Sequence, residues 1–455
     1  MNSSRGDVVD VAVIGAGLAG LTAARGIVAA GRSVAVLEAR DRVGGRTLDA
    51  RLSDDEVAEM GGQWIGPGHD RIAKLAASLG VETFPTYNDG DAVIVIAGQH
   101  LRYTGDHPAL EHSVRADLEQ AIHSFEALAG QIDLEHPWES PEAEALDAET
   151  FDAWLRHNVR TDTAREIFGR SVDGAIAVTA SELSLLGALV FIRTTQDFGT
   201  MVGVDGGAQQ DRFVGGSGRL AHLLAQALGD AVRLGSPVRR VEGPATTARV
   251  LADGVSIEAE RVIVAVPPTL AAEIEYEPQL PALLDGLLQR MPGGSVIKAN
   301  VVYDEPFWRL EGLSGQAFDP SLPVAWTMDN SPPAGRPGVL AAFFEARAAR
   351  RFAAASVADR RRVTLECLSR FFGPRAEKPV RYLEVDWSAE EWTRGCYFGQ
   401  RIPGAWTRFG RSLREPFGRI HWAGAETAVM WNGYMEGAVS SGERAAAEAL
   451  QALEG

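Results

Sequence analysis

Short runs of apolar residues, bounded by glycine or acidic residues, recur along the chain and predict buried strands. Such runs lie at 8–14, 33–37 and 262–266. A strand that is apolar at nearly every position is typical of a parallel sheet with both faces covered. Between the first two runs a helical pattern extends to about Ala30 and stops at Gly31. The pattern therefore predicts an α/β fold that opens with a strand, a helix and a second strand.

A different pattern begins after residue 87. Residues 91–105 predict a β-hairpin that turns at Gly98. Residues 110–132 have helical periodicity with charged faces, and further helices are expected around 151–168 and 181–191. Because none of these segments carries a nucleotide-binding motif, they predict a separate unit of sheet plus helices.

The sequence of strand, glycine turn and helix returns in "DRFVGGSGRLAHLLAQALGD", where Ser217 is expected to cap the helix. The pair Asp253 and Gly254 then predicts a hairpin before the apolar run that ends at residue 266. The chain closes with a predicted strand, glycine turn and long helix. We therefore predict two interleaved domains, the first made of 1–87, 214–292 and 390–455 and the second of 88–213 and 293–389.

Composition narrows the classes of protein. The chain has 455 residues, is 45% hydrophobic and 23% charged, and is long enough for two or three domains. Its net charge of −17 argues against a general nucleic-acid binder, which needs basic surface. Two cysteines can form neither a disulfide framework nor a usual zinc site, so we expect no metal and a reducing compartment.

Targeting signals are not evident in the sequence. The N-terminus passes straight into an apolar strand without a basic region, a signal-length apolar helix and a cleavage site. No uninterrupted apolar run of about 18 residues occurs. These observations predict a cytoplasmic protein without a membrane anchor.

The first helix is preceded by glycines in G-x-G-x-x-G spacing, at Gly15, Gly17 and Gly20. Glycines permit a tight turn and let the backbone approach a pyrophosphate at the positive end of the helix. Glu38, at the end of the second strand, is placed to accept hydrogen bonds from an adenosine ribose. The strand, glycines, helix, strand and acid occur in the right order, so we predict a dinucleotide site. The spacing leaves open which dinucleotide binds.

The continuation "EARDRVGGRT" resembles the second fingerprint of the FAD-containing amine oxidase superfamily. The resemblance implies that Gly44 and Gly45 let the chain pass close to the flavin diphosphate. It also implies that Arg46 offers the diphosphate charge-assisted hydrogen bonds. A Rossmann-type FAD-binding domain interleaved with a sheet-plus-helices substrate domain is the expected fold class.

Later segments resemble the same family. "EMGGQWIGP" resembles its next flavin contact, in which Gly61 and Gly62 admit the ring system. "RGCYFG" followed by "WAGAETAVMWNGYMEGAVSSGERAA" resembles the flavin-dependent monoamine oxidases, and together the motifs span nearly the whole chain. The FAD-binding residues implied are Gly15, Gly17, Gly20, Glu38, Arg40, Gly45, Arg46, Gly61, Gly62, Gln63, Trp64, Val238, Trp387, Cys396, Gly424, Ala425, Gly433, Tyr434 and Met435.

The resemblance also implies the residues that carry chemistry. Tyr397 and Tyr434 match the tyrosine pair that walls the path of the amine to the flavin, and two phenol faces make a slot that orients a slim aminomethyl group. Lys298, among β-branched residues on a strand expected to be buried, matches the lysine that holds a water against flavin N5. A buried ammonium is costly without a partner.

The implied reaction is oxidation of a neutral amine to an imine, which hydrolyses to an aldehyde while dioxygen reoxidises the flavin and forms hydrogen peroxide. The flavin supplies the chemistry, and the protein supplies orientation and desolvation. Gln209, Trp326 and Phe343 are expected to line the substrate cavity, and Trp387 to add an aromatic wall. The expected partners are a small-molecule amine and dioxygen, with neither nucleic acid nor a membrane anchor. Assembly as a homodimer is left open.

Three alternatives to a primary monoamine oxidase stay open. "RYTGDHP" and "SAEEWTRG" are also similar to bacterial putrescine oxidases, although a diamine would need an acid for its distal ammonium and "PVAWTMDN" is largely apolar there. An L-amino-acid oxidase would need an arginine facing the substrate carboxylate, for which Arg193 is a candidate. A flavin-binding scaffold without turnover is the third.

Cys396 aligns with the cysteine that covalent monoamine oxidases join to the flavin 8α-methyl group through a thioether. The resemblance therefore implies covalent FAD, and it implies a cis peptide bond between Cys396 and Tyr397. Gly395 removes a side chain that would crowd the ring, although Thr393 and Arg394 depart from the serine and glycine usual in the family.

Overall fold

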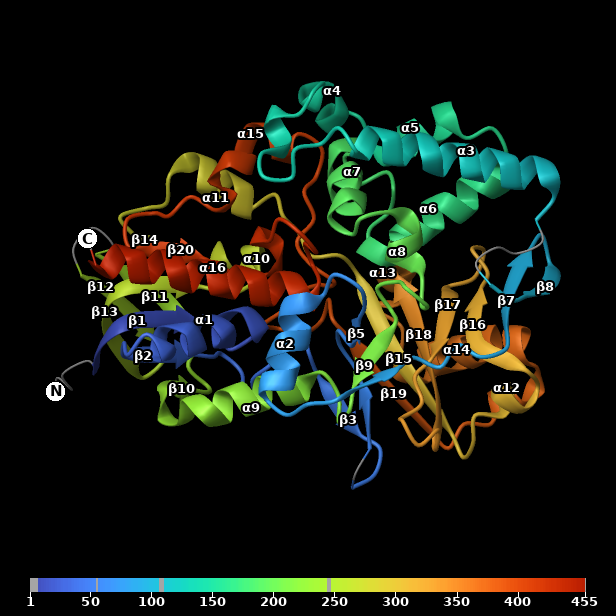
Figure 1. Cartoon of the computed structure of the whole chain (residues 1–455), viewed down its shortest axis with the longest axis horizontal. Helices are drawn as coiled ribbons and strands as arrows, with labels where there is room; N and C mark the ends of the chain where they lie inside the picture. The colour runs from blue at the N-terminus through green and yellow to red at the C-terminus, as the bar shows by residue number, and fades with distance from the viewer. Residues whose placement is uncertain (1–6, 55, 106–109, 244–246, 455) are drawn as a thin grey trace.

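The computed structural model describes residues 7–54, 56–105, 110–243 and 247–454. Figure 1 shows the described chain as two sheet regions side by side, with a group of helices above them. Within these residues no helix combines the length and apolarity needed to cross a membrane.

The first of these regions is an eight-stranded sheet among the described residues. Its strands are, in spatial order, β10 (Val232–Arg233), β2 (Val34–Leu37), β1 (Asp7–Ile14), β13 (Val255–Val264), β12 (Ala248–Ala252), β11 (Val238–Glu242) and β14 (Glu275–Glu277), with β20 (Ile420–Trp422) also paired to β13. β1 runs parallel to both β2 and β13, as the apolar runs predict.

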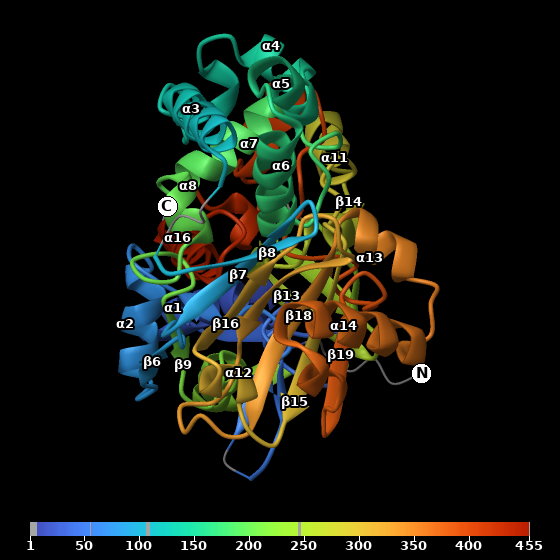
Figure 2. The ribbon, with the colours of Figure 1, turned by 90° about the vertical axis from the view of Figure 1, so that its right-hand side faces the viewer.

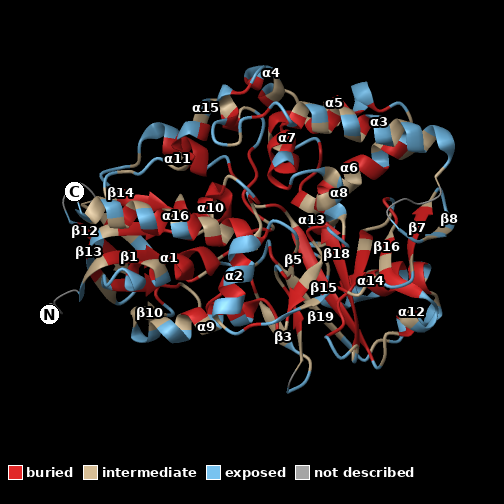
Figure 3. Cartoon of the chain, in the orientation of Figure 1, coloured by how far each residue is buried: buried red, intermediate tan, exposed pale blue. Residues whose placement is uncertain are grey.

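Both faces of the central strands are covered, which explains why their residues are apolar without alternation. On one face Val11, Val13 and Ile263 pack beneath helices; on the other Ala12 and Val264 join a second core. Figure 3 shows buried residues in the middle of this region and exposed residues on the outer helix faces. The helices on this side are α1 (Leu18–Ala29), α2 (Asp70–Ser78), α9 (Gly218–Leu228) and α16 (Met435–Glu454).

The second region is a seven-stranded sheet of the described residues. Its strands are, in spatial order, β19 (Arg381–Asp386), β15 (Val296–Tyr303), β18 (Gly338–Glu345), β17 (Val324–Asp329), β16 (Leu313–Phe318), β7 (Asp91–Ile96) and β8 (Gln99–Tyr103). The hairpin β7–β8 therefore joins strands more than 200 residues later in the chain. The exact domain boundaries given above stay a prediction.

Two small sheets connect these regions. They are β3 (Asp49–Arg51) with β4 (Val57–Glu59), and β5 (Trp64–Ile65) with β9 (Asp211–Phe213) and β6 (Thr83–Pro85). β5 and β9 bring the "GGQW" segment beside the glycine turn that precedes α9.

The helical group covers one end of the seven-stranded sheet (Figure 2). Its members are α3 (His112–Ala129), α4 (Ala143–Ala148), α5 (Phe151–Asn158), α6 (Asp162–Ile176), α7 (Leu185–Thr194) and α8 (Phe198–Val202). The remaining helices are α10 (Pro268–Ala271), α11 (Ala282–Leu288), α12 (Phe307–Leu310), α13 (Arg347–Phe352), α14 (Val357–Phe372) and α15 (Ala405–Phe409). Short 3₁₀ turns lie at Pro137–Glu139, Gly229–Ala231, Pro374–Glu377, Gly410–Leu413 and Ala425–Thr427.

The fold class is confirmed as mixed α/β, and the hairpins at Gly98 and Gly254 are present. One local prediction was wrong. Ser217 precedes α9 without a side-chain cap, because its hydroxyl donates to the carbonyl of Gly62 instead. A tertiary contact thus uses the group that local propensity assigned to the helix end.

Candidate active site

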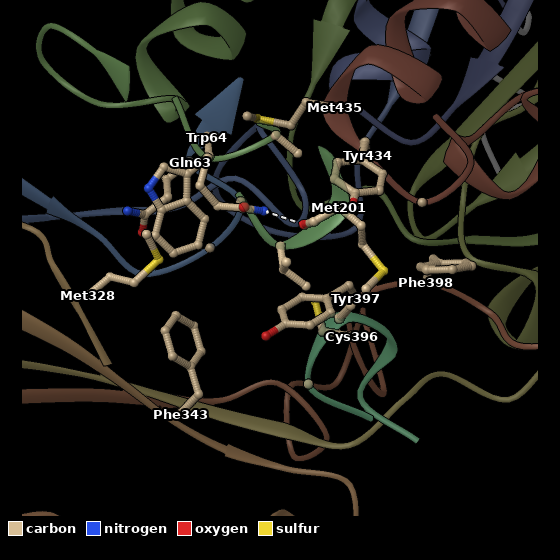
Figure 4. A pocket seen from close by; sticks show the side chains of 18 of the residues that line it. Gln63, Trp64, Met201, Met328, Phe343, Cys396, Tyr397, Phe398, Tyr434 and Met435 are labelled. Atoms are coloured by element: carbon tan, nitrogen blue, oxygen red, sulfur yellow. Dashed lines mark hydrogen bonds between the residues drawn. The ribbon is translucent and has the colours of Figure 1, made fainter. Parts of the chain in front are cut away.

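A cavity of about 1190 Å³ runs from the glycine loop after β1 to the seven-stranded sheet and the helical group. Figure 4 shows part of its wall, where side chains from several distant segments face a common space. Most residues expected at the site line it: Gly15, Gly17, Glu38, Arg40, Gly45, Arg46, Gly61, Gly62, Gln63, Trp64, Gln209, Val238, Trp326, Phe343, Cys396, Tyr397, Gly424, Ala425, Gly433, Tyr434 and Met435.

Three of the expected residues lie behind the cavity wall formed by the described residues: Gly20, Lys298 and Trp387. A Cβ at Gly20 would lie 2.0 Å from the carbonyl oxygen of Gly15, so this glycine allows the helix to pack against the loop. Trp387 does not form the expected cavity wall. Its indole N–H donates to the carbonyl of Met60 at 3.0 Å, which keeps the ring in the core.

The nucleotide end of the cavity has room and polar groups for a dinucleotide such as FAD. A Cβ added to Gly17 would meet no protein atom within 4 Å, so the backbone here faces open cavity. Glu38 is buried at the end of β2 and accepts the backbone N–H of Ala16 at 2.8 Å, which fixes the carboxylate beside the glycine loop. Arg40, two residues on, also lines the cavity and is held by Glu390. The ribose contact of Glu38 stays a prediction.

Arg46 is bound by an acid that sequence reasoning missed. Its guanidinium donates to Glu426 Oε1 at 2.7 Å and to the carbonyl of Tyr397 at 2.9 Å. Glu426 also accepts the backbone N–H of Gly399 at 3.0 Å. The pair therefore ties three distant segments together around the cavity. The expected contact of Arg46 with a diphosphate stays a prediction.

Cys396 is buried but lines the cavity. Its backbone N–H donates to the carbonyl of Gly294 at 2.8 Å, and the peptide bond to Tyr397 is cis. Burial raises the pKa of the thiol to about 12, although the charge of Arg46 opposes the shift. Cys367, on α14, packs in a core away from the cavity. The two cysteines thus occupy different environments.

The two tyrosines expected to wall the amine path, Tyr397 and Tyr434, both face the cavity (Figure 4). Tyr434 precedes α16 and stacks on Phe191 of α7, with ring centroids 6.1 Å apart and an interplanar angle of 18°. Burial raises the pKa of both phenols, so both remain protonated and uncharged near neutral pH. Their role as a substrate slot stays a prediction.

Aromatic side chains of the seven-stranded sheet form the other wall. Trp326 on β17 stacks on Phe343 of β18, with centroids 4.3 Å apart and an angle of 7°. Trp64 lies 6.2 Å from both rings. Gln209 also lines the cavity, and its side-chain amide donates to the carbonyl of Met201 at 3.1 Å. The lining therefore combines a stacked aromatic pair, a tilted third ring and a hydrogen-bonded amide.

Lys298 is buried on β15 as expected, with 3% exposure. Its ammonium donates to the carbonyl of Gly61 at 2.9 Å and to Gln63 Oε1, and it lies 5.5 Å from the ring centroids of Trp64 and Phe343. Burial lowers the pKa of Lys298 to about 7, although the charge of Glu59 opposes this. The ammonium is thus hydrogen-bonded to the segment that lines the cavity, and it titrates near neutral pH.

Glu345 is the second acid that sequence reasoning missed. It ends β18, is 2% exposed, and accepts hydrogen bonds from the Tyr397 hydroxyl at 2.9 Å and the Trp326 indole N–H at 2.7 Å. The only available signal was a single acid at the end of the apolar run "GVLAAFFE".

The arginine required by an amino-acid oxidase is not Arg193. This residue is exposed in the last turn of α7 and is not among the described residues that line the cavity. Arg170 of α6 does line the cavity, and its guanidinium lies 3.7 Å from the carboxylate of Asp173. Of Arg193 and Arg170, the one that lines the cavity therefore already has an acidic neighbour.

Comparisons with known proteins agree with this geometry. A family model for "Flavin containing amine oxidoreductase" matches residues 18–450. The chain is 39% identical over 442 residues to the "Probable flavin-containing monoamine oxidase A" of Dictyostelium discoideum, covering 96% of this chain and 97% of that one. A putrescine oxidase double mutant from a structure-based redesign of cofactor binding superposes with a TM-score of 0.95 at 39% identity, over 98% of this chain and 99% of the other. Cyclohexylamine oxidase from Brevibacterium oxydans superposes with a TM-score of 0.95 at 32% identity, over 98% and 100% of the two chains.

Proposed function

The chain belongs to the family of flavin-containing amine oxidoreductases, and on that premise we propose that it oxidises a primary monoamine, aromatic or aliphatic, with FAD as cofactor. The balanced reaction converts the amine, dioxygen and water to an aldehyde, ammonia and hydrogen peroxide. The observation that carries the proposal is the stacked aromatic pair of Trp326 and Phe343 in the same cavity as Tyr397 and Tyr434.

The protein residues would bind and orient a neutral amine. FAD, when bound, accepts two electrons and a proton from the amine carbon and returns them to dioxygen. The apolar walls disfavour an alkylammonium ion and exclude water, so the uncharged amine is the form that enters. Lys298 would hold a proton at Nζ, beside Gln63 Oε1, at pH values below its pKa of about 7.

A monoamine is favoured over a diamine by the chemistry of the wall. A second ammonium would need a carboxylate beside the aromatic wall. The carboxylates that line the cavity outside its nucleotide end, Asp89, Glu119, Glu126 and Asp205, belong to other segments. Trp326 occupies the wall, and the carboxyl group of Glu345 lies behind its indole instead of lining the cavity. Putrescine should therefore be a poorer substrate here than an amine with an apolar tail.

Hydrogen peroxide release from tyramine, phenethylamine, benzylamine, putrescine and L-phenylalanine tests the proposal. We expect higher kcat/KM for the three arylalkylamines than for the other two compounds. Preference for putrescine would establish the diamine oxidase alternative, and preference for L-phenylalanine the amino-acid oxidase. A flavin-loaded protein that oxidises none of a wide amine panel would be a scaffold, and the proposed activity would be wrong.

We further propose that Cys396 Sγ carries the flavin through a thioether to its 8α-methyl group. The thiol and the methyl group each lose one hydrogen, and dioxygen accepts both as hydrogen peroxide, so that the step balances. The proposal is supported by the position of Cys396 on the cavity wall, and by Gly395, whose φ of +129° belongs to a region that favours glycine.

Acid precipitation of the purified protein tests the bond. A yellow pellet with the intact mass raised by one FAD is expected from the wild type and from Cys367→Ala, whose cysteine is remote from the cavity. Cys396→Ala should give a colourless pellet and a yellow supernatant. A colourless wild-type pellet would show that the flavin is not covalently bound.

A further inference from the structure

One carboxyl group holds two walls of the proposed substrate cavity together. Glu345 Oε1 accepts from the Tyr397 hydroxyl at 2.9 Å, and Oε2 accepts from the Trp326 indole N–H at 2.7 Å. Tyr397 and Trp326 come from segments about 70 residues apart, and both line the cavity. Glu345 itself is buried behind them.

The strand geometry places this carboxyl group where it can hold both rings. Side chains alternate along β18, so Phe343 and Glu345 lie on one face of the sheet and Phe344 on the other. Phe343 stacks on Trp326, while Glu345 binds the indole nitrogen of the same side chain. Stacking sets the plane of the indole, and the hydrogen bond sets its rotation within that plane.

A glycine of α6 packs against the hydrogen bond between the carboxyl group and the indole. A Cβ at Gly174 would lie 3.1 Å from Glu345 Oε2 and 3.3 Å from Trp326 Nε1. These distances are tighter than ordinary contacts, so the glycine leaves just enough space for the carboxyl and the indole. Helix, strand and loop thus meet around a single buried polar group.

Burial of an acidic side chain is not explained by packing alone. Burying a carboxyl group is costly unless its oxygens are hydrogen-bonded, and an apolar side chain of similar size would fill the same space without that cost. Both oxygens of Glu345 are instead directed at side chains of the cavity wall. These contacts favour a role in orientation over one in packing.

We propose that Glu345 is a positioning residue that fixes Tyr397 and Trp326 relative to each other, so that one group sets both the amine slot and the shape of the substrate cavity. The inference rests on the proposed function, because it assigns a role to the walls of that site. Loss of the carboxyl group should allow both rings to change orientation. The ratio of kcat/KM between the best and the worst amine should then decrease.

The charge of Glu345 depends on groups from several elements. Burial raises the pKa of Glu345 to about 8, while the hydrogen bonds from Trp326 and Tyr397 oppose the shift. From α6, Arg170 lowers the pKa and Asp173 raises it, and the charged residue of the adjoining strand β15 is Lys298. Ionisation makes both carboxyl oxygens stronger acceptors. The hydrogen bonds from Tyr397 and Trp326 should therefore become stronger as pH rises through about 8.

Substitutions at position 345 separate orientation from packing. Glu345→Leu keeps the volume and removes both acceptors. Glu345→Gln can still accept from the Trp326 indole through its amide oxygen and donate to the Tyr397 oxygen through its amide nitrogen, so it should rescue. Phe344→Leu is the matched control, since Phe344 is on the same strand but packs on the opposite face against Phe352.

The first measurement is kcat/KM over a panel of amines, with flavin content and melting temperature recorded for each variant. We expect Glu345→Leu to lose about tenfold in the ratio between the best and the worst substrate, because two hydrogen bonds are lost. Glu345→Gln and Phe344→Leu should stay within about threefold of the wild type. An unchanged ratio in Glu345→Leu, or an equal loss in Phe344→Leu, would overturn the proposal.

The second measurement does not require turnover. Tryptophan fluorescence of the wild type, corrected with Trp326→Phe, should change with a midpoint near pH 8, and the change should be absent in Glu345→Gln. If no amine is oxidised by the wild type, the proposed function fails while this titration still decides the role of Glu345. A titration identical in Glu345→Gln would overturn that role.

A third variant covers the case in which Glu345→Leu does not fold. Gly174→Ala leaves the carboxyl group in place but crowds it and the Trp326 indole, so the substrate ratio should shift in the direction expected for Glu345→Leu. A folded Gly174→Ala enzyme with the wild-type ratio would contradict the proposal.

Discussion

Replacing Lys298 with methionine tests the proposed role of the one buried lysine at the site. Methionine has a similar length and no charge, so it fills the space on β15 without the ammonium. The substitution leaves the carbonyl of Gly61 and Gln63 Oε1 without their present donor. Because Lys298 lies behind the cavity wall, the flavin should still bind.

The magnitude follows from the burial of the lysine. Burial lowers the pKa of Lys298 from 10.5 to about 7, so the charged and neutral forms are equally populated near pH 7. Each pH unit changes their ratio by about tenfold, so the ammonium dominates at pH 6 and the neutral amine at pH 8. An ordered donor in a water-excluded site is worth about 100-fold in rate.

Reoxidation of the reduced enzyme by dioxygen is the clean assay, because no substrate amine titrates in that step. In stopped-flow absorbance at pH 6, 7 and 8, the wild-type rate constant should fall as pH rises through about 7, since the ammonium is lost. Lys298→Met should be slower by about 100-fold at pH 6 and insensitive to pH.

The matched control is Lys74→Met, which makes the same substitution at an exposed lysine on α2. This variant should keep the wild-type rate and pH profile. If Lys298→Met reoxidises at the wild-type rate with the wild-type pH profile, and the reductive half-reaction is also unchanged, Lys298 takes no part in the mechanism and the reasoning is refuted.

Two further substitutions test the cavity wall and the pair behind it. Trp326→Ala should shift preference toward bulkier amines by about tenfold in relative kcat/KM, measured by peroxide release. Trp138→Ala, at a tryptophan outside the cavity lining, is the control and should not change the preference. An unchanged substrate profile in Trp326→Ala would make Trp326 a core residue. Glu426→Gln should cost about 3 kcal/mol or more of stability at pH 7, because it leaves the guanidinium of Arg46 without its carboxylate. Burial opposes ionisation of Glu426, but the charge of Arg46 keeps the pKa below 4.5, so the stabilisation is present above pH 4.5 and is lost as pH falls through the native pKa. The difference in melting temperature between wild type and Glu426→Gln should therefore shrink at low pH, and a constant difference would contradict the ion-pair argument.

Local signals were sufficient for the dinucleotide end of the site. A short continuous stretch of sequence contains β1, the glycine loop, α1, β2 and Glu38 in that order. This order predicted where the glycines and the acid lie in the structure. The burial of Lys298 could also be predicted from neighbouring residues. The strand around it is mostly apolar, which is typical of a strand with both faces covered, so the lysine side chain is buried as well. Such features depend on periodicity and turn chemistry, which neighbouring residues determine.

The amine end depended on contacts between segments far apart in the chain. Glu345 binds Tyr397 and Trp326 through hydrogen bonds, and Arg46 pairs with Glu426. No sequence pattern indicates that these residues, which come from distant segments, are in contact. Sequence alone shows which residue types can hydrogen-bond but not which way a side chain is turned.

The two wrong predictions have the same origin. Ser217 donates to Gly62 instead of capping its helix, and Trp387 turns into the core. Arg193, a candidate only for the amino-acid alternative, is exposed on α7, while Arg170 lines the cavity. The sequence by itself therefore determined the elements and the nucleotide-binding loop, because these follow from local pattern. Only the tertiary structure decided which polar groups meet at the cavity, because a buried donor or acceptor takes the partner that packing brings within reach.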